Sequence, residues 1–272
     1  MMKIFVPTDF SPLSSAACDL AVQLARLGKW EVIFHHAFSS TIDWVSITQE
    51  VAEGLPPVKG DVSHARARLQ ALEEKYPDVV VRTQLSNYET VDELMEAAKE
   101  EGVDWIVAGT RGRQDLSNQI MGSDTQRMLR LASCPVITIR EPVAFPWRNL
   151  LLVTDLNENI GSAVEQLLVL RELMQAQVHL GYVNSPVEFR STEEAESRMQ
   201  ELCGRFPDTD FRLHIYDHIR IDIGIRKLAE RTGADAVGLV THNHSAWFRL
   251  FSQSLTETIA LDSPVPVISF HH

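Results

Sequence analysis

The chain has 272 residues, of which 44% are hydrophobic and 23% charged, a composition typical of globular proteins. Its net charge is −12, and residues 1–145 carry 14 basic and 20 acidic side chains against 11 and 17 in residues 146–272. Each half therefore has a charge of −6, which disfavours nucleic acid and anionic membranes as main partners. Three cysteines without a CxxC pair, no signal peptide and no membrane-length apolar run together favour a cytoplasmic location.

The first half alternates apolar and amphipathic stretches, which predicts alternating strands and helices. Strands are expected near 3–8, 31–37, 79–85, 104–109 and 135–140, and helices near 12–27, 62–75, 90–101 and 123–132. Ser11-Pro12 is typical of a helix start, and Thr90 with Glu93 is typical of a capping box. Gly28 and Gly102 are placed to end helices.

The second half repeats the first. A shift of 146 residues aligns Thr8-Asp9 with Thr154-Asp155, and a shift of 131 aligns Thr110 with Thr241 and Ser123 with Ser254. The order and register of such matches indicate a duplication. The second set of strands is expected near 149–154, 178–183, 210–216, 235–241 and 266–270.

Val- and Ile-rich central strands with helices between them predict an α/β fold with a mostly parallel, doubly wound sheet in each half. We expect two tandem Rossmann-like domains, residues 1–141 and 148–272, separated by a linker that contains Pro142 and Pro146.

The segment Gly109-Thr110-Arg111-Gly112, followed after nine residues by Gly122-Ser123, is the most specific motif. Glycines after a strand and a hydroxyl residue at a helix start let backbone N–H groups and the helix dipole face a phosphate chain. Ser123 and Thr125 can add hydroxyl donors, and Arg111 or Arg113 can add charge-assisted hydrogen bonds. The motif predicts a nucleotide site.

Asp9 ends the first strand, and Gly109 ends the fourth. Ligands of open α/β sheets bind where the strand order reverses. If these two strands flank that point, Asp9 and Gly109 lie side by side. The Asp9 carboxylate can then accept a hydrogen bond from an adenine amino group or a ribose hydroxyl. In the alternative interpretation, Asp9 caps the helix that opens at Pro12 or is a buried carboxylate held by backbone N–H groups.

The start Val6-Pro-Thr-Asp-Phe-Ser11, the glycine motif and the terminal Cys134-Pro-Val-Ile-Thr-Ile139 together resemble the universal stress protein family. The second half is similar to a diverged copy. The resemblance implies tandem five-stranded domains of the adenine nucleotide α-hydrolase type, in which ATP-binding members place adenine near Asp9 and Ala37. It also implies that strands 135–140 and 266–270 pair, which would make one chain a pseudo-dimer.

The expected ligand is an adenine nucleotide, ATP or another, which can bind together with Mg²⁺. The expected protein partner is a second copy of the chain, in a homodimer, or a protein that the sequence does not identify. No catalytic or metal-ligating residue is assigned. The candidate nucleotide-binding residues are Thr8, Asp9, Ala37, Ala108, Gly109, Arg111, Gly112, Gly122, Ser123, Asp124 and Thr125.

The sequence departs from the family pattern in two ways that bear on nucleotide binding. Asp124 stands at a usually apolar position, where its carboxylate repels a polyphosphate unless it points away or Mg²⁺ bridges the two. In the second half Val240, Asn243 and Gln253 replace the three motif glycines. We therefore expect the second half not to bind ATP in the family mode.

Other signals have alternative interpretations. His35 and His36 are expected to point to opposite faces of a strand, which disfavours a metal site there. His242 and His244 have metal-capable spacing, but no ligand set completes them. The segment 247–251 is interpreted as core or inter-domain packing, or as an apolar or partner-binding site that replaced the nucleotide site.

These signals favour a cytosolic nucleotide-binding regulator that acts in the stress response. The alternatives are a weak nucleotide hydrolase, although the chain has no Walker lysine and no identifiable base and nucleophile, and a nucleotide-free scaffold. Gly109→Val or Gly122→Val is expected to abolish nucleotide binding without disturbing the fold.

Overall fold

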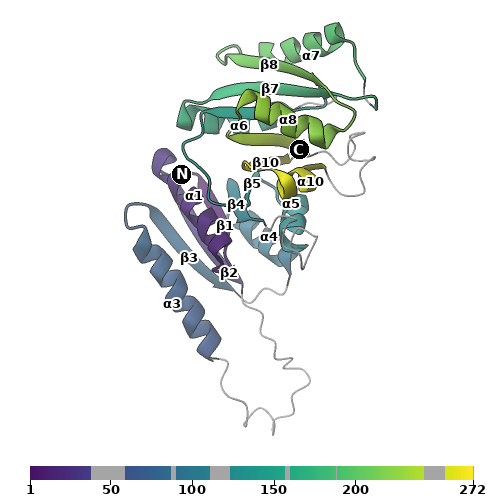
Figure 1. The fold of residues 1–272 in the computed structure, drawn as a ribbon. Coiled ribbons are helices and arrows are strands. Elements are labelled where there is room, and N and C mark those ends of the chain that lie inside the picture. The colour runs from purple at the N-terminus through teal and green to yellow at the C-terminus, as the bar shows by residue number, and fades with distance from the viewer. Residues whose placement is uncertain are drawn as a thin grey trace.

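The computed structural model contains one ten-stranded sheet with the order β3-β2-β1-β4-β5-β10-β9-β6-β7-β8 (Figure 1). The structure describes residues 1–37, 59–86, 90–110, 123–156, 160–187, 189–241 and 255–271.

In the first half the elements are β1 (Lys3–Pro7), α1 (Pro12–Gly28), β2 (Glu31–Ala37), α3 (Lys59–Lys75), β3 (Val80–Ser86), α4 (Val91–Glu100), β4 (Trp105–Gly109), α5 (Ser123–Leu131) and β5 (Val136–Ile139). In the second half they are β6 (Asn149–Val153), α6 (Gly161–Met174), β7 (Gln177–Asn184), α7 (Thr192–Gly204), β8 (Phe211–Asp217), α8 (Ile221–Thr232), β9 (Ala236–Thr241), α10 (Leu255–Asp262) and β10 (Val267–His271).

The predicted α/β class is confirmed, and each predicted strand is present with bounds within about one residue of the expectation. Hydrophobic periodicity explains this accuracy, because the central strands β1 and β4 are buried along most of their length. Within each half the neighbouring strands are parallel.

The helix signals act as expected, with one difference. Ser11 caps α1 by accepting a hydrogen bond from the Ser14 amide, and Thr90 forms the capping box of α4. Gly102 follows α4 with a φ of 62°. Gly28, however, is the last residue of α1, and Lys29 takes the left-handed conformation with a φ of 53°.

The two halves meet along the antiparallel pair β5·β10, in which Ile137 faces Ile268. This is the strand pairing that the family resemblance implied. The Thr138 hydroxyl donates a hydrogen bond to the Val267 carbonyl across the seam, at 3.3 Å. The sheet is consequently continuous from β3 to β8 (Figure 1).

The two halves also share details of the backbone. Phe10 and Leu156, at equivalent positions after β1 and β6, have φ values of 60° and 59°. In each turn the preceding threonine hydroxyl, that of Thr8 or Thr154, accepts from the amide of this residue at 3.0 Å. Such conformations are uncommon for residues other than glycine, so their recurrence supports a common origin of the two turns.

The helices α1 and α6 contact each other, as do α4 with α5 and α8 with α10. In the described part of the chain, no helix combines the length and the hydropathy that a membrane span requires.

Candidate functional site

The strand order of the first half reverses between β1 and β4, which are parallel neighbours with Ile4 opposite Trp105 and Phe5 opposite Ile106. The carboxyl ends of both strands therefore lie at one edge of the sheet. The expectation that these strands flank the switch point is confirmed. The structure brings Thr8 and Asp9, which follow β1, to the same edge as Ala108 and Gly109 of β4.

The turn after β1 is held by hydrogen bonds. The Thr8 amide donates to the His35 carbonyl at 2.8 Å, and the exposed Asp9 accepts from the Ser11 amide through Oδ1 at 2.9 Å. Ser11, not Asp9, is the helix cap, so the interpretation of Asp9 as the α1 cap is wrong. Partial desolvation raises the pKa of Asp9, but hydrogen bonds with Ser11 and Ser14 outweigh it and hold this pKa below 3.8. The exposed side chain is thus an anion at neutral pH.

Close packing gives a separate reason for a glycine at position 109. A Cβ at this position would lie 2.6 Å from Leu13 Cγ and 3.1 Å from the Leu13 carbonyl oxygen. The backbone of β4 therefore approaches α1 more closely than a side chain permits. The expectation that Gly109→Val leaves the fold intact is wrong, because the new side chain would press against the helix backbone.

The N-terminus of α5 lies beside the end of β4. The buried Thr125 donates its hydroxyl hydrogen to the Gly109 carbonyl at 3.4 Å, so that hydrogen is already used within the protein. Asp124 is exposed in the first helical turn. The first turn of a helix has free backbone N–H groups and a positive end of the dipole, which together favour an anion.

Three predicted residues, Arg111, Gly112 and Gly122, lie outside the described residues. Ser123 begins α5, and the structure describes its backbone only. Ala37 ends β2 with its side chain exposed, next to β1 in the sheet.

Three further residues surround this edge that the sequence interpretation did not select. The His36 Nδ1–H donates to the Thr8 carbonyl at 2.7 Å, and its ring lies 4.4 Å from that of Phe10. The guanidinium of Arg68 on α3 is 4.4 Å from the Phe10 ring centroid and donates to the Phe10 carbonyl at 3.2 Å. Together they form an aromatic and cationic stack beside Asp9. Of these three residues, only His36 had a sequence signal for its position, which was the alternation of side chains along the strand.

His35 has a different role. Its ring is buried, stacks on Phe5 with centroids 5.3 Å apart, and joins Ser86 Oγ through Nε2 at 2.7 Å. Burial, with a smaller contribution from the charge of His36, lowers the pKa of His35 to about 4. The side chains of His35 and His36 therefore lie in different environments, as the strand alternation predicted.

At the equivalent edge of the second half, the counterparts of Asp9, His36 and Ala37 are buried. Asp155 is buried, whereas its counterpart Asp9 is exposed. Tyr182 and Val183, at the positions of His36 and Ala37, are both fully buried. Val240 belongs to β9, whereas Asn243, Gln253, His242, His244 and the segment 247–251 lie outside the described residues.

In the described ranges, no cluster of three or more His, Cys, Asp or Glu side chains is arranged to hold a metal ion. The three cysteines are free thiols. Burial raises the pKa of both Cys18 and Cys134 to about 12, so neither is a reactive thiolate at neutral pH.

Comparison with known proteins agrees with this geometry. Residues 1–140 match the model of the universal stress protein family. The chain belongs to the universal stress protein family. The universal stress protein YxiE of Bacillus subtilis is 30% identical over 145 residues, which cover 98% of that protein and 51% of this chain.

Solved structures match over the whole length. A universal stress protein from Archaeoglobus fulgidus has a TM-score of 0.70 and 17% identity, and the match covers 99% of this chain and 96% of that one. A Pseudomonas aeruginosa protein of unknown function has a TM-score of 0.68 and 17% identity over 100% and 92%. These matches show that the two proteins share the fold of this chain over nearly its whole length.

Proposed function

We propose that the first half binds an adenine nucleotide, with ATP as the leading candidate, at the carboxyl edge between β1 and β4. The observation that carries this proposal is the meeting of an anionic turn, Thr8–Asp9, with the end of β4 and the start of α5 at one switch point. Switch points are where open α/β sheets bind ligands. Membership of the family is consistent with this proposal.

Each group has a distinct role. The ionised Asp9 accepts a hydrogen bond from a ribose hydroxyl or the adenine amino group. The rings of Phe10 and His36 offer apolar surface beside Ala37 for the base. The phosphates follow the segment from Gly109 to Ser123 and end at the N-terminus of α5. Mg²⁺ between Asp124 and the phosphates would relieve their repulsion.

We propose further that residues 1–141 and 148–272 are two domains that form a pseudo-dimer through β5·β10, and that the second no longer binds nucleotide. The burial of Asp155, Tyr182 and Val183 supports the loss of that site. Nucleotide occupancy of the first domain would then regulate contacts of a cytoplasmic protein during stress, rather than support turnover.

The test is to measure which ligand the purified protein holds and how many sites it has. Denaturation followed by mass spectrometry of the released small molecules is expected to yield one adenine nucleotide per chain. Isothermal titration with ATP, AMP and adenosine, with and without Mg²⁺, then ranks the ligands. No released nucleotide and no binding heat would contradict the proposal, and ADP accumulating with time would replace the regulator with a hydrolase.

The decisive variant is Asp9→Asn. Asparagine keeps an Oδ1 acceptor for the Ser11 amide, so the turn is retained while the charge and one acceptor are lost. Binding is expected to weaken about 10-fold, which corresponds to about 1.4 kcal/mol. Asp155→Asn is the matched control at the same position of the repeat and should leave affinity unchanged. Circular dichroism checks the fold of both. Equal losses in the two variants would contradict the assignment.

A further inference from the structure

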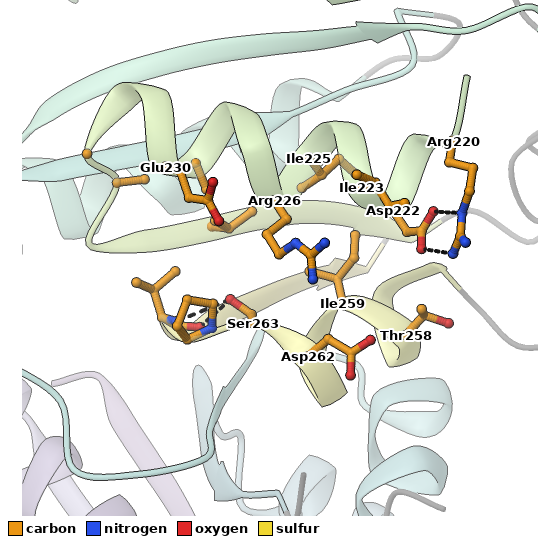
Figure 2. Close-up of a pocket in the computed structure, with 16 residues that line it drawn as sticks. Arg220, Asp222, Ile223, Ile225, Arg226, Glu230, Thr258, Ile259, Asp262 and Ser263 are labelled. Atoms are coloured by element: carbon orange, nitrogen blue, oxygen red, sulfur yellow. Dashed lines mark hydrogen bonds and ion pairs between the residues drawn. The ribbon is translucent and has the colours of Figure 1, made fainter. Parts of the chain in front are cut away.

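A pocket of about 320 Å³ opens in the second half between α8 and α10, away from the edge described above (Figure 2). Its walls include Ile225 and Ala229 of α8, Ile259 of α10 and Val237 of β9. Charged side chains lie around it, and Figure 2 shows Arg226 reaching from α8 toward Ile259. The combination of an apolar interior and a few polar groups is characteristic of small-molecule sites.

The corresponding region of the first half has different side chains. The shift of 131 residues that relates the halves matches Gly102 with Gly233, and both have a φ of 62°. By the same shift, the α4–α5 pair corresponds to α8–α10. Met95 of α4 and Met128 of α5, at the positions of Arg226 and Ile259, are both buried. A long apolar side chain is thus replaced by a charged one in the second half.

A second difference opens the pocket further. In the first half Asp92 of α4 and Arg127 of α5 form a bidentate ion pair, with N–O distances of 2.5 and 2.8 Å. The corresponding residues of the second half are Ile223 and Thr258, which both line the pocket and cannot form this pair. The bridge between the two helices is therefore absent at the equivalent position, and the space is accessible.

The charges around the pocket carry both signs. Arg220 and Asp222 satisfy each other at 2.6 Å. Arg226 and Glu230 are exposed, and neither forms an ion pair with the described part of the chain, although they are four residues apart on α8. Asp262 of α10 adds a further carboxylate to the lining. A ligand that bears one charge of each sign matches this arrangement better than a simple anion or cation.

We propose that this pocket binds a free α-amino acid with an apolar side chain. Its carboxylate pairs with the Arg226 guanidinium, its ammonium group with the Glu230 carboxylate, and its side chain fills the space above Ile225 and Ile259. At about 320 Å³, the pocket lies near the lower end of the range of about 300–1,000 Å³ that is typical of ligand sites, which suits a small ligand such as leucine or phenylalanine.

The ligand chemistry is tested by titrating the full chain with L-leucine and its two truncated analogues, 4-methylpentanoate and 3-methylbutylamine. Chemical-shift changes in protein NMR spectra report binding and its location. Leucine is expected to bind at least about 10-fold more tightly than either analogue, because each analogue loses one ion pair. Equal binding of the acid or the amine would overturn the zwitterion assignment, and no binding of leucine or phenylalanine at millimolar concentration would overturn the site.

Variants test the location. Arg226→Gln is expected to weaken leucine binding about 10-fold, whereas Lys227→Gln, exposed on the same helix and not part of the lining, should have no effect. The double variant Ile223→Asp with Thr258→Arg introduces the ion pair of the first half and is expected to abolish binding. Thermal unfolding checks that it folds. Unchanged leucine binding in a folded double variant, or in Arg226→Gln, would overturn the proposal.

Discussion

Lowering the pH from 7 to 5 is expected to destabilise the protein, and the buried ring of His35 contributes a part of this loss that one variant isolates. The ring is 2% exposed, and its pKa of about 4 lies below the ordinary value of 6.5 because burial disfavours the charged form. Above pH 6.5 the ring is neutral in both the folded and the unfolded chain. As the pH falls, the His35 ring takes up a proton in the unfolded chain but not in the folded chain. The free energy of unfolding therefore decreases between pH 6.5 and about 4, and below that range this decrease levels off.

The size of this effect follows from the difference between the two pKa values. One pKa unit corresponds to about 1.4 kcal/mol, so the fall from 6.5 to about 4 limits the loss to about 3 kcal/mol. About 2 kcal/mol of it is expected between pH 7 and 5. That is a large share of the stability of an ordinary domain.

Urea unfolding at pH 7 and pH 5, followed by circular dichroism, measures this loss. His35→Gln retains a polar group that can reach Ser86 Oγ but cannot be protonated, so its pH-dependent loss should be smaller than that of the wild type by about 2 kcal/mol. His64→Gln, at an exposed position of α3, is the control and should follow the wild type. Equal pH-dependent losses in the wild type and His35→Gln would refute the reasoning.

Two further predictions concern packing and helix capping. Gly109→Ala is expected to cost about 1–3 kcal/mol in urea unfolding, because its Cβ would lie 2.6 Å from Leu13 Cγ. Gly204→Ala, with no atom within 4 Å of the new Cβ, is the control, and an equal effect of the two would contradict the packing argument. Ser11→Ala and Ser191→Ala each remove a side-chain cap and should cost about 1 kcal/mol in the same assay. No loss in either would show that the cap is replaced by water.

Much of the architecture was predictable because it depends on local pattern. Helix starts at Ser11 and Thr90 follow from side chains that satisfy neighbouring amides, and the strand bounds follow from apolar periodicity. The candidate site was predictable in outline, since parallel strands on both sides of a switch point must end at one edge. The role of Gly109 was not, because the sequence does not show that Leu13 lies against it.

The sequence by itself determined the class of fold and the meeting of the β1 and β4 ends, and it indicated a duplication, because each of these depends on short-range pattern or on the register between the two halves. Only the tertiary structure decided which side chains surround the site. Phe10, His36 and Arg68 come from a turn, a strand and a helix, and they meet through packing between distant segments. The pocket between α8 and α10 likewise depends on a few side-chain exchanges between two helices, whose effect appears only when the helices are packed together.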